Sequence, residues 1–187
     1  MRHNEIRDTV GNWMAEVCKG VCTEPTLQPI TDEVLSGASA ITSEGARLDI
    51  AANDFWGGWF QHAYFDVRVF NPYAPSNRHQ SLSATYKKHE RIKIRAYEQR
   101  IREVEHGSFT PLVMSLSGGV GNAARVCYKR LASMLAEKWD QPYRAWMTLI
   151  CPPEIIHTVH PGSSVHCTCG PHWNTILSTN RPRSGRI

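Results

Sequence analysis

The chain of 187 residues has no apolar run close to the roughly 18 residues that mark a membrane-spanning helix. Its opening segment, MRHNEIRDTV, lacks the apolar stretch of a secretory signal, and no segment repeats another. These absences predict an intracellular protein without a membrane anchor. The six cysteines are therefore expected to be reduced thiols rather than a disulfide framework.

Apolar residues are also sparse, at 41% of the chain, although this is too many for a fully disordered protein. A chain of this length buries roughly 70% of the surface that it exposes when unfolded, so a single core needs no disulfide. Periodic patterns fade near residue 144, and the remainder is rich in Pro, His, Cys, Thr and Ser. The sequence therefore predicts one folded domain over residues 1–144 and an irregular or disordered tail over residues 145–187.

Acidic residues are scarce in the middle of the chain. Residues 1–66 carry 4 basic and 10 acidic side chains, a net charge of −6, whereas residues 67–144 carry 14 and 6, a net charge of +8. An acidic cluster beside a basic half suits a polyanion that binds together with metal ions. The simpler alternative is that these charges cover a solvated surface, and charge alone does not decide between the two.

Hydrophobic periodicity predicts three helices and four strands. The predicted helices span residues 3–19, 88–105 and 122–139. The predicted strands are residues 46–52, 63–70 and 110–116, with a weak strand within residues 21–30. The order is helix, weak strand, two strands, basic helix, strand, helix. This order predicts an α/β fold in which a small mixed sheet is flanked by helices.

A glycine pair, Gly57–Gly58, lies between the two clearest strands and is typical of a two-residue hairpin turn. With this turn, Ile50 faces Phe65 and Asp49 faces Asp66. Two carboxylates about 4 Å apart repel by roughly 4 kcal/mol at an effective dielectric constant of 20. A divalent cation with oxygen ligands removes this repulsion. In the alternative reading the turn is longer, the register shifts, and both aspartates face solvent.

At these residues the chain resembles the restriction-like endonuclease domain of early-branching non-LTR (LINE-type) retrotransposon polyproteins. The matching blocks occur in order over residues 2–143. They are RHNEIRD (2–8), EPTLQP (24–29), ARLDI (46–50), FDVRVFNP (65–72), RAYEQRIREVEHGSFTPLV (95–113) and YKRLASMLAEKWDQPY (128–143). The resemblance implies the PD-(D/E)xK, restriction-endonuclease-like fold with an αβββαβ core.

The resemblance also implies an activity, namely Mg²⁺-dependent nicking of target DNA for target-primed reverse transcription, with Mn²⁺ as a substitute metal. In such elements the domain follows a reverse transcriptase and a Cys/His zinc knuckle, which are the partners it implies and which this chain lacks. A nuclear site of action is expected for this function. The chain thus resembles a piece of a mobile element, truncated or decayed.

The resemblance assigns roles to individual residues. Asp49 and Asp66 would hold Mg²⁺, and Arg68 would contact the scissile phosphate in place of the lysine that the family usually carries. Lys87 or Lys88, from the following helix, is a candidate substitute for that lysine. Glu5 would supply an outer carboxylate, and His3 would contact the DNA backbone. The exposed basic stripe expected to bind DNA phosphates consists of Lys88, Arg91, Arg95 and Arg102; a merely solvated helix face is the alternative.

Two further hypotheses come from other features. Arginine stays protonated and cannot accept a proton, so Arg68 leaves open a catalytically inactive nucleic-acid-binding remnant. The tail also offers a set of candidate zinc ligands, although their spacing does not form the paired halves of known structural zinc sites. These candidates are Cys151, His157, His160, His166, Cys167, Cys169 and His172. A reading-frame shift in a decayed copy is an alternative origin for the tail.

Overall fold

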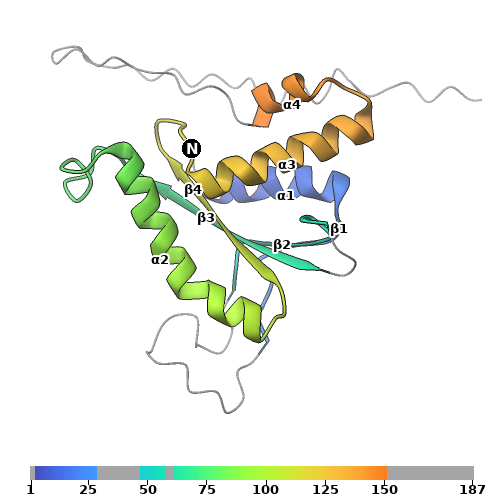
Figure 1. Ribbon diagram of the computed structural model, residues 1–187, viewed down its shortest axis with the longest axis horizontal. Helices are drawn as coiled ribbons and strands as arrows, with labels where there is room; N and C mark the ends of the chain where they lie inside the picture. Colours follow the sequence, from blue (N-terminus) through green and yellow to red (C-terminus); the bar gives the residue numbers. More distant parts are fainter. Residues whose placement is uncertain (1–2, 29–46, 58–60, 151–187) are drawn as a thin grey trace, which may run out of the picture. The chain divides into compact units, whose positions relative to one another are not determined.

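The computed structural model describes residues 3–28, 47–57 and 61–150, all within one compact unit of residues 1–155. The elements follow the chain in the order shown in Figure 1: α1 (His3–Val17), β1 (Lys19–Thr23), β2 (Ile50–Asn53), β3 (His62–Phe70), α2 (Leu82–Glu103), β4 (Ser108–Ser115), α3 (Asn122–Trp139) and α4 (Tyr143–Ile150). No helix in these ranges is long and apolar enough to cross a membrane.

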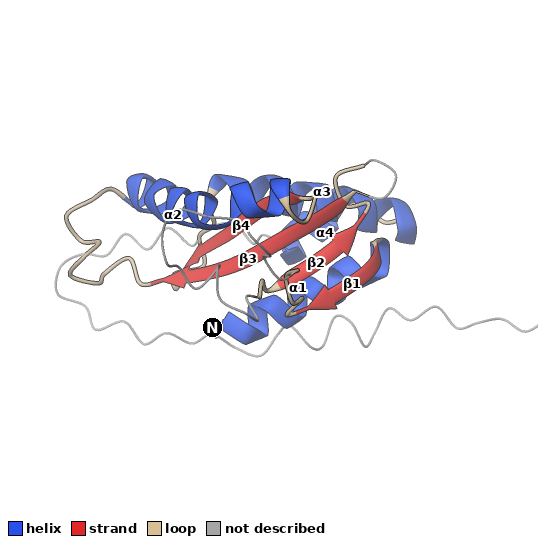
Figure 2. Cartoon of the chain, turned by 90° about the horizontal axis from the view of Figure 1, so that it is seen from below, coloured by secondary structure: helices blue, strands red, loops and turns tan. Residues whose placement is uncertain are grey.

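The four strands form one mixed sheet in the order β1-β2-β3-β4, and Figure 2 shows them side by side. β1 and β2 pair antiparallel, as do β2 and β3, while β3 and β4 are parallel and joined through α2. A mixed α/β fold with a small sheet flanked by helices was expected from the sequence and is confirmed.

The two faces of the sheet are covered differently. α1 and α3 lie next to each other and pack on one face (Figure 1), where Met14, Phe65 and Leu131 belong to the largest hydrophobic core. α2 covers the other face through smaller apolar clusters, one around Ile101 and one around Tyr86. Because successive strand residues point to opposite faces, β3 contributes Phe65 to the first face and Tyr64 to the second.

Apart from ends of α1 and α2 that fall two residues early, the helices match the sequence prediction with two differences. α3 has the predicted bounds, and α1 ends two residues earlier than predicted, at Val17. α2 begins at Leu82 rather than at residue 88, because the Ser81 hydroxyl accepts a hydrogen bond from the Ala84 amide and caps the helix. The second difference is α4, which makes residues 145–150 helical although they fall in the predicted tail. The candidate zinc ligands of the tail lie outside the described residues.

The strand predictions need three corrections. The weak strand begins before the predicted range of residues 21–30 and overlaps only its first three residues, at Lys19–Thr23. The strand predicted over residues 46–52 forms only from Ile50 onward, since the chain bends at Asp49 and the Val67 amide donates to the Asp49 carboxylate. The two strands of the hairpin extend one residue further toward the turn than predicted, since their pairing ends at Asn53 and His62; Gly58 of the predicted two-residue turn lies outside the described residues. The predicted register is nevertheless correct, with Ile50 opposite Phe65.

Candidate functional site

The candidate site lies on the α2 side of the sheet, where β3 presents Asp66. This carboxylate is buried, with 5% of its surface exposed. Its Oδ2 atom lies 2.7 Å from the ammonium nitrogen of Lys93, which projects from the middle of α2. The ring of Tyr97, one turn further along α2, has its centroid 5.4 Å from the same nitrogen. A buried carboxylate therefore meets a lysine with a cation–π neighbour.

Asp49 joins this cluster from the residue that precedes β2. Its Oδ2 accepts a hydrogen bond of 2.6 Å from the Val67 amide, so the carboxylate is fixed beside the centre of β3. His3 Nε2, at the start of α1, lies 3.2 Å from the same oxygen and 3.0 Å from the Val67 carbonyl oxygen. Both of these oxygens are acceptors, which means that Nε2 carries the proton. His3 thus positions the Asp49 side chain.

The two carboxylates influence each other. Burial raises the pKa of Asp66 above its ordinary value, and the charge of Asp49 raises it further, whereas the Lys93 ammonium works in the opposite direction. The pKa of Tyr97 is also raised, first by burial and then by the charges of Asp66 and Asp49. Asp49, Asp66, Lys93 and Tyr97 therefore form one electrostatic cluster.

The donor set of this cluster suits Mg²⁺, which prefers oxygen ligands and often takes only one or two carboxylates from a protein. Asp66 Oδ2 is buried and pairs with the Lys93 ammonium nitrogen at 2.7 Å. A carboxylate has about four lone-pair sites on its two oxygens, so this pairing leaves further sites to which a cation could bind. No group of three or more His, Cys, Asp or Glu side chains suited to a metal occurs among the described residues.

Other predicted site residues lie apart from this cluster. Arg68 is exposed on β3. Its charge contributes to the lowered pKa of His89, which is lowered first by burial and then by the charges of Arg68 and Lys88. Lys87 lines a separate pocket between α2 and α3. Glu5 is exposed on the first turn of α1, two residues after His3.

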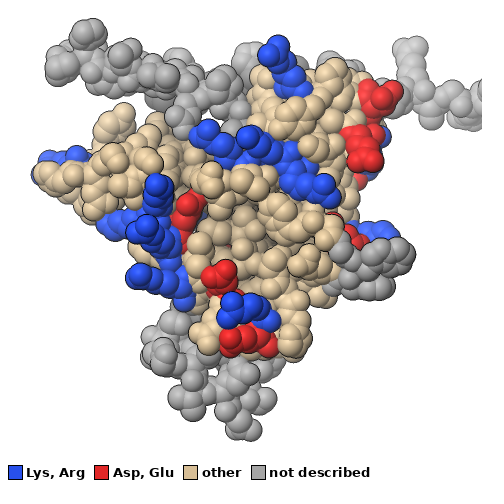
Figure 3. Space-filling view, viewed as in Figure 1, with Lys and Arg blue, Asp and Glu red and all other residues tan. Residues whose placement is uncertain are grey.

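The predicted DNA-binding stripe of α2 faces solvent. All four of its side chains are exposed, namely Lys88, Arg91, Arg95 and Arg102. Figure 3 shows basic side chains gathered along α2. Arg102 differs from the others because its Nη2 lies 3.3 Å from the Glu103 carboxylate. We refer to the first three, together with Lys87, as the α2 basic row.

Lys93 is the functional candidate that the sequence reasoning missed. The reasoning looked for a replacement lysine at the start of the helix, at Lys87 or Lys88. A signal for Lys93 was present, since it precedes Tyr97 by four residues and so shares a helix face with that aromatic side chain, which is expected to point inward. A lysine on an inward-facing stripe needs a buried partner, and Asp66 is that partner.

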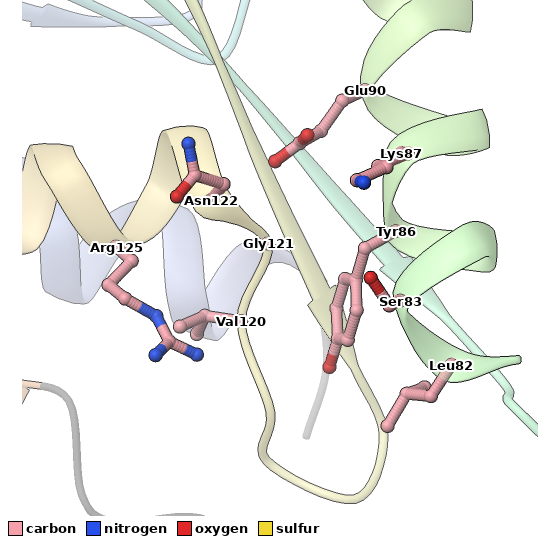
Figure 4. Close-up of a pocket in the computed structure, with 9 residues that line it drawn as sticks. All are labelled: Leu82, Ser83, Tyr86, Lys87, Glu90, Val120, Gly121, Asn122 and Arg125. Carbon is pink, nitrogen blue, oxygen red and sulfur yellow. The ribbon is translucent and has the colours of Figure 1, made fainter.

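The pocket at Lys87 has a volume of about 290 Å³ and lies between the first turns of α2 and the beginning of α3 (Figure 4). Its lining residues are Leu82, Ser83, Tyr86, Lys87, Glu90, Val120, Gly121, Asn122 and Arg125. The Glu90 carboxylate accepts a hydrogen bond of 3.0 Å from the Ala123 amide in the first turn of α3. A hydrogen bond between a side chain of α2 and the backbone of α3 therefore links the two helices at this pocket.

Comparison of the chain with protein-family models, with curated proteins and with solved structures gives no match.

Proposed function

We propose that this chain is a Mg²⁺-dependent DNA endonuclease with a restriction-endonuclease-like core. The observation that carries the proposal is the clustering of Asp49, Asp66 and Lys93 around β3, where Asp66 pairs with Lys93, Asp49 accepts from the Val67 amide, and the charge of Asp49 acts on Asp66. Two carboxylates and one lysine are the chemical groups that the PD-(D/E)xK resemblance calls for. The lysine comes from α2 in this chain, which compensates for the arginine at position 68.

The proposed roles follow from the chemistry of each group. Asp49 and Asp66 would hold the metal, which when bound lowers the pKa of the attacking water and offsets charge on the scissile phosphate. The attacking water gives up a proton to solvent as its oxygen bonds to phosphorus, the bond from phosphorus to the 3′ oxygen breaks, and that oxygen takes up a proton from solvent. Lys93 is positioned to donate to a phosphate oxygen as negative charge develops there. His3 holds Asp49 in place.

A catalytically inactive nucleic-acid-binding domain is the second candidate. The exposed α2 basic row favours it, because such a row binds phosphates without any need for chemistry. Under the first candidate, the nick would supply the 3′ end for target-primed reverse transcription in a complete mobile element. Under the second, the chain binds DNA and leaves it intact.

The test is nicking of supercoiled plasmid by the full chain in the presence of Mg²⁺. The wild type is expected to convert plasmid to the open circular form, and EDTA is expected to stop the reaction. Asp49→Asn keeps the shape of the side chain but removes a charged ligand, and we expect nicking to fall by about 10³-fold, which corresponds to roughly 4 kcal/mol of transition-state stabilisation.

A matched control is Lys138→Gln, which removes a charge from an exposed lysine that pairs with Glu16 at the far end of α3. This variant should nick at the wild-type rate. Equal nicking by wild type and Asp49→Asn would exclude the proposed site. Plasmid binding without any nicking by the wild type would favour the inactive candidate, and Arg68→Lys would then show whether a strand lysine restores cleavage.

A further inference from the structure

Glu24 follows β1 and lies opposite Asp49, one of the two proposed metal ligands. Two antiparallel partner pairs flank this position, Thr23 with Ile50 and Thr26 with Arg47. The same register places Glu24 against Asp49, and the Glu24 amide donates a hydrogen bond of 2.9 Å to the Asp49 carbonyl oxygen. The backbone that carries this ligand is therefore held from the β1 side.

The backbone of Asp49 bends before β2 begins, so the direction of its carboxylate depends on the contacts around it. On the β3 side, the Asp49 amide donates to the Phe65 carbonyl oxygen at 3.2 Å, and the Val67 amide donates to the Asp49 carboxylate. The hydrogen bond from Glu24 is the corresponding contact on the β1 side. Displacement of Glu24 should therefore redirect the Asp49 carboxylate.

The backbone conformation of Glu24 is unusual for its residue type. Its φ angle is 52°, in the left-handed region that favours glycine. Its carboxylate forms an ion pair with Arg7 of α1, and the exposed Arg47 lies 3.7 Å from the other carboxylate oxygen. A glycine would adopt this backbone without strain but would offer Arg7 no carboxylate. The Glu24 side chain therefore ties the turn after β1 to α1.

α1 supplies a partner for each of the two opposed acidic residues. His3 contacts the Asp49 carboxylate, and Arg7, one helical turn later on the same face, pairs with Glu24. Glu24 does not join Asp49 and Asp66 in a group of three metal-ligating side chains within the described ranges. Its contact with Asp49 is through the backbone.

We propose that Glu24, held by Arg7, is a positioning residue that directs the Asp49 carboxylate toward the metal ion. This inference rests on the proposed function and adds a residue to which the sequence reasoning gave no role. Partners that orient a metal ligand typically change metal affinity by about 10- to 100-fold when they are removed. The affinity of the chain for a divalent cation is therefore the property to measure.

The experiment measures binding of Mn²⁺ to the full chain by isothermal titration calorimetry without DNA. Glu24→Gly keeps the left-handed backbone accessible and removes the carboxylate, and the dissociation constant for Mn²⁺ should rise about 10-fold. Urea denaturation should show nearly unchanged stability, because relief of the backbone strain offsets the loss of a half-exposed ion pair. A lower stability with unchanged Mn²⁺ affinity would mean that Glu24 has only a structural role, and would overturn the proposal.

The matched control is Asp140→Gly. Asp140 is also acidic and exposed, and it has a φ angle of 48° at the end of α3. This variant makes the same change of charge and relieves the same backbone conformation, and it should bind Mn²⁺ as the wild type does. An equal rise of the dissociation constant in both glycine variants would overturn the proposal, since the effect would then come from charge or backbone alone.

A double-mutant cycle tests the link to Arg7. Arg7→Gln and Glu24→Gln should each weaken Mn²⁺ binding, and the double variant should weaken it no further, because both changes break one contact. Arg7 keeps Asp8 as a partner at 2.8 Å in the Glu24 variant. Additive losses, or unchanged affinity in Arg7→Gln, would show that Arg7 does not act through Glu24 and would overturn the proposal.

The outcome is separable from that of the proposed function. Weaker Mn²⁺ binding by Glu24→Gly together with no nicking by the wild type supports the role of Glu24 and removes the nuclease. Unchanged Mn²⁺ binding by Glu24→Gly together with nicking that Asp49→Asn abolishes leaves the nuclease in place and overturns the role of Glu24. Failure of the wild type to bind Mn²⁺ would overturn the role of Glu24, and the plasmid assay would still decide the nuclease.

Discussion

The side chains on the two sides of β3 differ in polarity, although they alternate along one strand. Phe65 and Val67 are buried among the apolar side chains of α1 and α3. Asp66, between them, points to the α2 side and pairs with Lys93. Burial of the apolar side stabilises the fold, whereas burial of Asp66 raises its pKa and so opposes ionisation.

Asp66 is therefore expected to contribute less to stability than its two apolar neighbours. A charged pair packed against a sheet contributes little net stability, because desolvation offsets the attraction between the charges. Substitutions on the two sides of β3 should separate stability from the proposed activity.

The largest effect is expected from Phe65→Ala. Phe65 is fully buried and its ring lies edge-on to that of Phe55, with centroids 5.1 Å apart. Its truncation leaves a cavity in the main core and should reduce the free energy of unfolding by about 4 kcal/mol. Urea denaturation followed by circular dichroism measures this loss.

The matched change on the other face is Arg68→Ala. Arg68 is exposed, and we expect the free energy of unfolding to change by no more than about 0.5 kcal/mol. Similar losses for the two variants would mean that the faces do not differ in their contribution to stability.

The second prediction concerns Lys93→Met, which keeps an apolar stem near Tyr97 and removes the cation from Asp66. The rate of plasmid nicking at saturating DNA should fall about 100-fold, as for the loss of one transition-state donor. Lys88→Met, an exposed change on the same helix, should leave that rate unchanged. If the two variants lose equal activity, Lys93 acts only through the general charge of α2.

Periodicity predicted the register of the hairpin. Ile50 lies opposite Phe65, and the pairing continues to Asn53 and His62 in the register that a turn at Gly57–Gly58 predicts. The alternation of apolar and polar residues in β3 specifies the face of each side chain and therefore the register.

Features that depend on tertiary contacts were not predictable in the same way. The bend at Asp49 depends on its hydrogen bond with the Val67 amide, a partner 18 residues away. The start of α2 depended on the Ser81 cap, a local signal that was overlooked when the helix was predicted to begin at residue 88. Lys93 was predictable in principle from its helix face, but its partner became evident only when α2 was placed on the sheet.

The third prediction uses the pH dependence of stability. The pKa of Asp66 is raised in the folded protein, so the folded state holds the proton more tightly than the unfolded state does. The stabilisation from Asp66 is therefore complete below the unfolded pKa of about 4 and is lost as pH rises through the folded value. Asp66→Asn does not titrate, and this decline should be absent from its urea unfolding curves.

The readout for Asp66→Asn is the slope of unfolding free energy against pH above about pH 4, relative to that of the wild type. The absolute value also changes, since Lys93 loses its partner at every pH in this range. Parallel slopes in the two proteins would show that Asp66 titrates normally, and the electrostatic contrast between the two sides of β3 would then be lost.

The smallest expected effect is a difference in DNA binding between two arginines on the solvent-facing side of α2. This side of the helix contributes to neither the core nor the Asp66 cluster. Arg91 is exposed, whereas Arg102 lies 3.3 Å from the Glu103 carboxylate. Arg91→Gln should reduce the salt slope of DNA binding by about 0.9, the contribution of one phosphate. Arg102→Gln should reduce it by less, because the nearby carboxylate already offsets much of its charge. Anisotropy titrations at several salt concentrations measure both slopes, and a larger fall for Arg102→Gln would show that DNA displaces the Glu103 contact.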